Sequence, residues 1–166
     1  MKLNLCCAAI LGLLTLEAVA TPSGWPVRQP GLWQIDVQVG TAPPVQVRQC
    51  TSPEVDVDTF MSIVPAQENC RRQVHRLAQD KWRVATVCEI HGHAAHGDVR
   101  FEGDPKKAYN GSYSVRKPHQ LPLETGSFRA RYLGPCEASL KPGEMLLPNR
   151  VKVDTTQRHD EHDHQH

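Results

Sequence analysis

The sequence predicts a mainly β protein: an antiparallel meander of about seven strands that forms a curved sheet or partly closed barrel, with one short helix. Two observations predict this class. Apolar and polar residues alternate along several short segments, which is the period of a strand with one face in water. Glycine, proline and aspartate separate these segments at short intervals, so we expect consecutive strands to form hairpins.

The first expected hairpin covers residues 31–50. Trp33 and Ile35 belong to an apolar series at odd positions, and the glycine and prolines of residues 40–44 make a turn before the alternation resumes toward Cys50. A second hairpin is expected from residue 70 to residue 90, with its tip at residues 79–81.

Between the two hairpins the spacing becomes helical, from Ser52 to Val64. Ser52 is expected to cap this helix, Pro53 takes its first position and Pro65 ends it. A helix this short is hardly stable alone in water, so we expect it to pack against the sheet. Its apolar face is formed by Phe60, Ile63 and Val64.

Three further strands are expected after a glycine-bearing connection at residues 91–97. They include residues 99–101, 109–115 and 128–132, and the last strand ends before Cys136. Beyond that cysteine the period is lost, which favours an extended segment that passes into a disordered polar tail.

The first 20 residues have the pattern of a cleavable secretion signal. Lys2 supplies a positive charge, an apolar run follows, and Ala18-Val19-Ala20 forms the small-x-small site that signal peptidase needs. We expect cleavage after Ala20, a periplasmic mature protein, a β domain at residues 21–136 and a tail at residues 137–166. Because a membrane anchor needs about 20 apolar residues, the interrupted run favours cleavage, after which no segment spans the membrane. A lipoprotein cut at Cys6 or Cys7 would leave almost no apolar stretch.

Composition limits the function classes. The 166 residues leave room for one domain, and the net charge of +1 offers no basic field for phosphates, so nucleic-acid binding is disfavoured. No catalytic elbow, metalloprotease helix, phosphate loop or dinucleotide fingerprint is present in the sequence, which favours a protein that is not an enzyme.

The mature chain keeps four cysteines, which are Cys50, Cys70, Cys88 and Cys136. An even set without a CxxC pair in an exported protein predicts two disulfides. A hairpin that turns near residue 79 places Cys70 directly across from Cys88, and Cys50 then pairs with Cys136 by exclusion. Because Cys50 has the parity of the polar residues of its strand, we expect it past the strand end or at a bulge.

Several short motifs follow one another in a fixed order along the chain. They are Pro30-Gly31-Leu32-Trp33, Gln49-Cys50, Cys70, the strand from Trp82 to Cys88, Phe101-Glu102-Gly103-Asp104, Tyr109-Asn110-Gly111-Ser112 and Gly134-Pro135-Cys136. Together they resemble the exported bacterial family catalogued as domain of unknown function 3617. The resemblance covers about residues 29–136 and implies a periplasmic β domain with four cysteines, with no assigned activity. The chain departs from that family in having charged and histidine residues where members are rich in methionine and threonine, and in its histidine tail.

Histidines suggest one candidate chemistry. Zinc, copper or nickel are the metals that imidazole and carboxylate ligands bind, and the last eight residues hold four imidazoles and three carboxylates. The alternative is a solvated polar tail. The candidate ligands are His159, His162, His164 and His166, with a weaker set at His91, His93 and His96, whose alternative is exposed histidines at a hairpin tip.

Two more groups have a structural and a functional interpretation. Arg71, Arg72, His75 and Arg76 form a basic cluster, which we interpret as the wet face of a strand. Aromatic residues could line a barrel cavity for an apolar ligand, or could fill the core. They are Trp33, Trp82, Tyr109, Tyr113, Phe128 and Tyr132.

Three hypotheses therefore follow from the sequence. The first is a non-catalytic periplasmic binding or structural module with an unknown partner. The second is a periplasmic protein that handles a divalent metal through its histidine tail. The third is a carrier of a small apolar ligand inside the barrel.

Overall fold

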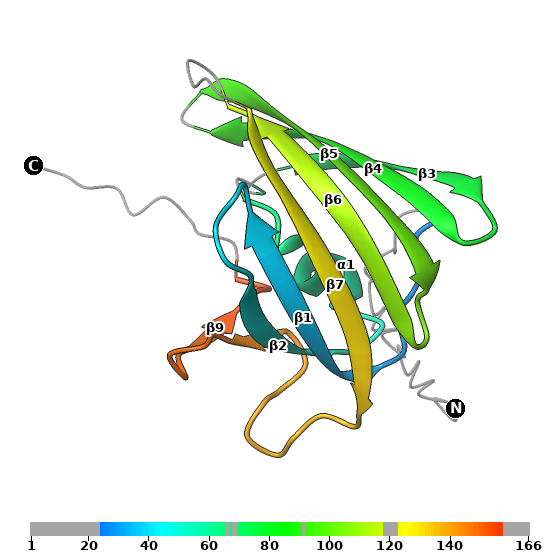
Figure 1. Ribbon diagram of the computed structural model, residues 1–166, viewed down its shortest axis with the longest axis vertical. Helices are drawn as coiled ribbons and strands as arrows, with labels where there is room; N and C mark the ends of the chain where they lie inside the picture. Colours follow the sequence, from blue (N-terminus) through cyan, green and yellow to red (C-terminus); the bar gives the residue numbers. More distant parts are fainter. Residues whose placement is uncertain (1–23, 66, 68–69, 91, 118–122, 158–166) are drawn as a thin grey trace, which may run out of the picture.

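The computed structural model describes residues 24–65, 67, 70–90, 92–117 and 123–157. Within these residues the strands form one antiparallel sheet in the order β3-β4-β5-β6-β7-β1-β2-β8-β9. The sheet curves around helix α1, and β3 and β9 remain its two edges (Figure 1). The predicted curved sheet with one short helix is confirmed, and the sheet does not close into a barrel.

The element bounds follow the chain. The helix is α1 (Asp56–Met61). The strands are β1 (Gly31–Val39), β2 (Val45–Thr51), β3 (Cys70–Ala78), β4 (Lys81–Ile90), β5 (His93–Asp104), β6 (Ala108–Arg116), β7 (Glu124–Gly134), β8 (Glu144–Leu146) and β9 (Lys152–Asp154).

The seven predicted strands correspond to β1–β7. In the second hairpin Cys70 pairs with Cys88, and Val74 pairs with Val84, as the turn near residue 79 predicts. The connection expected at residues 91–97 is shorter, because β5 already begins at His93 and pairs with the end of β4 at Ile90. Alternation alone placed this strand start too late, since the segment before Val99 contains alanine and glycine in place of large apolar residues.

The core fills the concave side of the sheet, where α1 presses Phe60 against the strands. The Phe60 ring lies 4.9 Å from Phe101, 5.1 Å from Trp25 and 5.6 Å from Tyr109, measured between ring centroids. Aromatic pairs at such separations add stabilisation beyond the area they bury. The aromatic residues thus tie α1, the sheet and the segment before β1 into one core.

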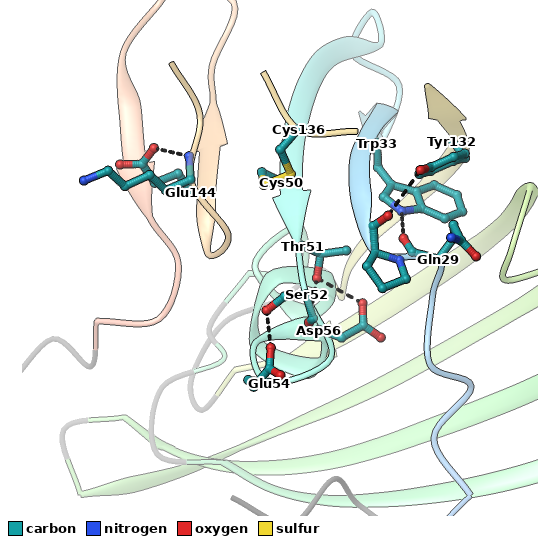
Figure 2. The surroundings of a disulfide bond; sticks show 12 residues. Gln29, Trp33, Cys50, Thr51, Ser52, Glu54, Asp56, Tyr132, Cys136 and Glu144 are labelled. Atoms are coloured by element: carbon teal, nitrogen blue, oxygen red, sulfur yellow. Dashed lines mark hydrogen bonds between the residues drawn. A yellow bond between two sulfur atoms is a disulfide. The ribbon is translucent and has the colours of Figure 1, made fainter. Parts of the chain in front are cut away.

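The start of α1 differs from the prediction. The helix begins at Asp56 after Val55 and has no side-chain cap, so Ser52 is not its capping residue. The Ser52 hydroxyl instead donates to the carboxylate of Glu54 (Figure 2), and the backbone N–H of Val55 donates to the carbonyl of Ser52 in a turn before the helix. Phe60, Ile63 and Val64 are all buried, as predicted, but the helix ends at Met61, so Ile63 and Val64 lie beyond it and only Phe60 belongs to the helix.

A second, smaller apolar cluster lies behind β2 and explains the position of Cys50. This residue is inside β2, opposite Leu32 of β1, and is fully buried, so the expectation that it lies past the strand end or at a bulge is wrong. The physical reason is that Leu140 and the disulfide to Cys136 cover the outer face of the strand here. Parity marks an outward residue, but an outward residue is exposed only if nothing covers it.

The chain after Cys136 continues the sheet. β8 pairs with β2, and β9 pairs with β8, so two strands that the sequence pattern did not predict lie in the segment expected to be merely extended. The backbone N–H of Gly143 donates to the carbonyl of Cys50, and the N–H of Thr155 donates to the carbonyl of Gly143. Among the described residues, no helix has the length and apolar character to span a membrane.

Candidate binding site

The concave face carries an apolar hollow at the end of the sheet where β1 and β2 meet in their hairpin. Its volume is about 300 Å³, at the lower limit of pockets that hold small ligands. Every side chain in its lining is apolar. The lining residues are Val37, Val39, Ala42, Pro43, Val45, Val47, Ile63 and Met145.

The strand period and the position of α1 together create this hollow. Val37 pairs with Val45 across β1 and β2, so both side chains point to the concave face. The helix ends at Met61, and Ile63 closes one side of the hollow, while Met145 of β8 packs against the same core. The tip of the β1–β2 hairpin extends beyond Ile63 and Met145.

The rim of the hollow is unusually exposed for an apolar wall. Val39 is 46% exposed and Val45 is 48% exposed, although both belong to strands. Burying such surface against an apolar ligand is favourable by about 25 cal/mol for each Å² removed from water. None of the lining side chains is an acid, a base or a nucleophile, so the arrangement favours binding and offers no group for catalysis.

A buried tyrosine hydroxyl lies beside the hollow. Tyr113 of β6 faces Gly126 of β7, and Gly126 faces Val39 of β1. A Cβ atom on Gly126 would lie 2.5 Å from the Tyr113 hydroxyl oxygen, so the tyrosine ring lies over this glycine and points toward β1. The hydroxyl is buried and has no hydrogen-bond partner in the described part of the chain. Burial, with a smaller effect of Glu124, raises the Tyr113 pKa.

The opposite end of the concave face holds a buried charged pair. Arg28 is 2% exposed and Asp56 is 1% exposed, and the Arg28 Nε donates to the Asp56 carboxylate at 2.6 Å. The indole of Trp25 and the hydroxyl of Thr51 donate to the same carboxylate, at 2.9 and 3.2 Å (Figure 2 shows the bond from Thr51). Buried charges of this kind persist only where partners satisfy them.

The remaining donors of Arg28 are also satisfied. Its Nη1 donates to the Gln49 side chain at 3.2 Å and to the Tyr109 hydroxyl at 3.1 Å. Burial raises the Tyr109 pKa, so the hydroxyl is neutral and accepts this bond. Burial by itself lowers the Arg28 pKa, but Tyr109 and Asp56 outweigh it and the net direction is upward. This network joins the segment before β1 to α1 and gives every guanidinium nitrogen of Arg28 a hydrogen-bond acceptor, which indicates a structural role.

The histidines predicted as metal ligands are mostly outside the described residues. His159, His162, His164, His166 and His91 all lie there. The described pair, His93 and His96, are three positions apart in β5, so their side chains point to opposite faces of the strand. Among the described residues, no group of three or more histidine, cysteine, aspartate or glutamate side chains could hold a metal ion.

Both predicted disulfides are present. Cys70 is bonded to Cys88 with a Cα–Cα distance of 4.0 Å, and Cys50 is bonded to Cys136 with a Cα–Cα distance of 5.5 Å.

The basic cluster belongs to the edge strand β3, as interpreted. Arg72 lies 3.3 Å from the carboxylate of Asp58, and the guanidinium of Arg76 lies over the ring of Trp82. The aromatic residues proposed as cavity lining fill the core instead, with Tyr132 only partly buried. None of them belongs to the lining of the hollow, which is aliphatic.

Neither the hollow nor the Arg28–Asp56 network was predicted from the sequence. For the hollow a signal existed: Val39 and Val45 are large apolar residues directly beside a turn rich in glycine and proline, where a purely structural hairpin usually carries polar residues. For the network there was none, because nothing local to Arg28 or Asp56 indicates that they meet.

Comparison with known proteins gives one match. The family model described as "Protein of unknown function (DUF3617)" matches residues 28–136, which is more than half of the chain. No curated protein matches the chain, and no solved structure matches it.

Proposed function

The chain belongs to the DUF3617 family of proteins of unknown function, and from that premise we propose its function on its own geometry. It is a non-catalytic periplasmic protein that binds a small apolar molecule in the hollow between the β1–β2 hairpin, Ile63 and Met145. The observation that carries this proposal is an entirely aliphatic lining with two half-exposed valines at its rim. Exposed apolar surface of this kind commonly marks a place where something binds.

The shape of the protein supports binding over a purely structural role. A small closed barrel is often filled by its own side chains, but this sheet is open and α1 covers only part of its concave face (Figure 1). The hollow continues the core cluster, since Val37, Val47, Ile63 and Met145 all pack there. A ligand would therefore extend the core.

The proposed location rests on the leader and the disulfides. Disulfides persist in oxidising compartments, and two of them close this domain. The test is mass spectrometry of the protein from its native cells. We expect a periplasmic fraction with Thr21 as the first residue and both bonds formed, whereas free thiols on a chain that keeps its leader would contradict the location.

The binding proposal is tested with the neutral fluorescent probe N-phenylnaphthylamine. Val45→Asp places a charge on the wall of the hollow, and Val151→Asp is a matched control because Val151 is equally exposed, at 49%, but lies outside the hollow. We expect the wild type and the control to bind the probe with enhanced fluorescence and Val45→Asp to lose at least tenfold in affinity. Equal binding by the two variants, or no binding by the wild type, would refute the proposal.

A second candidate function rests on the sequence of the tail. Four imidazoles and three carboxylates in the last eight residues are good ligands for zinc, copper or nickel. The test compares the full chain with a chain ending at Gln157, which keeps β9 and the hydrogen bonds of Thr155 and Thr156. Calorimetric titration of each metal should show binding to the full chain only. Equal binding by both chains would end the tail hypothesis.

A further inference from the structure

We infer that the ligand of the hollow is an amphiphile, with an apolar body and an uncharged hydrogen-bonding head that bonds the hydroxyl of Tyr113. This inference rests on the proposed function and adds the chemistry of the ligand to it. It starts from a buried polar group that has no hydrogen-bond partner in the described residues, the Tyr113 hydroxyl beside the aliphatic wall.

The sheet register places the hydroxyl within reach of the hollow. Val39 lines the hollow and is the β1 neighbour of Gly126, over which the Tyr113 ring lies. Neighbouring strands are about 4.8 Å apart, so the hydroxyl over β7 and the wall on β1 are separated by the spacing of two adjacent strands. Val39 is 46% exposed, so its side chain is packed less tightly than that of a core valine.

The absence of a substituent at Gly126 is what permits this arrangement. A Cβ atom there would meet the Tyr113 ring at 2.4 Å and the carbonyl oxygen of Gln38 at 2.6 Å. The glycine therefore lets the ring cross β7 and carry its hydroxyl toward β1. A buried hydroxyl without a partner is destabilising, because it has lost its hydrogen bonds to water. A ligand head that bonds it removes this cost, which a hydrocarbon does not.

The surroundings select an uncharged head. Burial raises the Tyr113 pKa, so the hydroxyl is neutral and both donates and accepts. The carboxylate of Glu124 acts on it electrostatically and would repel an anion, and Lys117 lies 2.8 Å from that carboxylate and is already paired with it. A carboxylate head would thus be buried without a counter-charge. An alcohol, ester or amide head fits.

The experiment compares three probes that share one skeleton: butylbenzene, phenylbutanol and phenylbutanoate. Each is titrated by NMR into the wild type, Tyr113→Phe and Tyr132→Phe. Tyr132→Phe is the matched control, because it also removes one tyrosine hydroxyl, which bonds the carbonyl of Pro30 away from the hollow.

In the wild type we expect phenylbutanol to bind about fivefold more tightly than butylbenzene, and phenylbutanoate to bind most weakly. Tyr113→Phe should bind butylbenzene as the wild type does and lose the preference for the alcohol, while Tyr132→Phe keeps it. Thermal unfolding should show Tyr113→Phe at least as stable as the wild type, because the hydroxyl lacks a partner in the described residues.

Three results would overturn the inference: equal binding of the alcohol and the hydrocarbon by the wild type, a preference that survives in Tyr113→Phe, or tightest binding of the carboxylate. In each of these cases butylbenzene still binds, so the hollow remains a binding site and the proposed function stands. If none of the three probes binds the wild type, the inference fails together with the proposed function.

Discussion

The two ends of the concave face differ in how completely their side chains are packed and hydrogen-bonded. At one end, aromatic rings and the Arg28–Asp56 network fill the space, and each guanidinium nitrogen of the arginine has an acceptor. At the other end, aliphatic side chains surround an open hollow, and the Tyr113 hydroxyl beside it has no partner in the described residues. One sheet thus carries a sealed end that holds the fold together and an unsatisfied end that is available for binding.

This difference teaches which polar groups to interpret as functional. A buried charge attracts attention in a sequence, yet here the buried charges are fully bonded and join the segment before β1 to α1. The feature that points to a ligand is less conspicuous in the sequence. It consists of half-exposed valines and a buried hydroxyl without a hydrogen-bond partner in the described residues. The two ends are distinguished by unmade hydrogen bonds and uncovered apolar surface, and not by charge.

The largest expected loss of stability comes from a substitution in the Arg28–Asp56 network at the sealed end. Asp56→Ala leaves Arg28 buried without its counter-charge, which should lower the free energy of unfolding by about 4 kcal/mol. Urea unfolding followed by tryptophan fluorescence measures this loss. The control is Asp36→Ala, because Asp36 accepts a hydrogen bond from Gln46 on the surface and its loss should change stability by about 0.5 kcal/mol or less. A similarly small loss for Asp56→Ala would show that the network is not structural.

A smaller effect compares a fully buried core valine with a valine at the rim of the hollow. Val99 is fully buried among the strands, and Val99→Ala should cost about 2 kcal/mol through lost burial and the cavity left behind. Val39→Ala removes a half-exposed side chain and should cost about 0.5 kcal/mol or less. Equal losses in urea unfolding would mean that the rim of the hollow is packed as firmly as the core, which would contradict its role as an open wall.

The smallest effect concerns alkaline pH. Burial raises the Tyr109 pKa in the folded state, so the unfolded chain loses this proton first, near pH 10. The stability contribution is complete below that pH and is lost as pH rises through the folded pKa, at up to about 1.4 kcal/mol per pH unit. Between pH 8 and pH 11 the free energy of unfolding should fall more steeply for the wild type than for Tyr109→Phe. Parallel curves would contradict this assignment.

Much of the fold could be predicted from the sequence, because strand period and turn residues are local signals. The turn near residue 79 fixed the register that brings Cys70 to Cys88, and the second pairing followed from it. Where the prediction failed, a distant segment changed the outcome. Leu140 covers the outer face of β2 at Cys50, and β8 pairs with Arg48 and Gln49 of β2, which lie almost 100 residues earlier in the chain.

The site was harder to predict than the fold, since it depends on what is left uncovered. The alternation of Val37, Val45 and Val47 predicts a concave face, but it does not show that α1 ends before it covers that face. The distance between Tyr113 and Val39 depends on the order β6-β7-β1, a pairing of strands far apart in the chain. Residue types alone directed attention to histidines, which either lie outside the described residues or face opposite ways in β5.

The most direct test of the account is an NMR titration of the protein with valine methyl groups labelled, using phenylbutanol as the ligand. We predict saturable chemical-shift changes confined to the valines that line the hollow, Val37, Val39, Val45 and Val47, while the core valines Val84, Val99 and Val115 stay fixed. Shifts that spread evenly over both groups, or no shifts at all, would contradict the claim that the uncovered end of the sheet is a binding site.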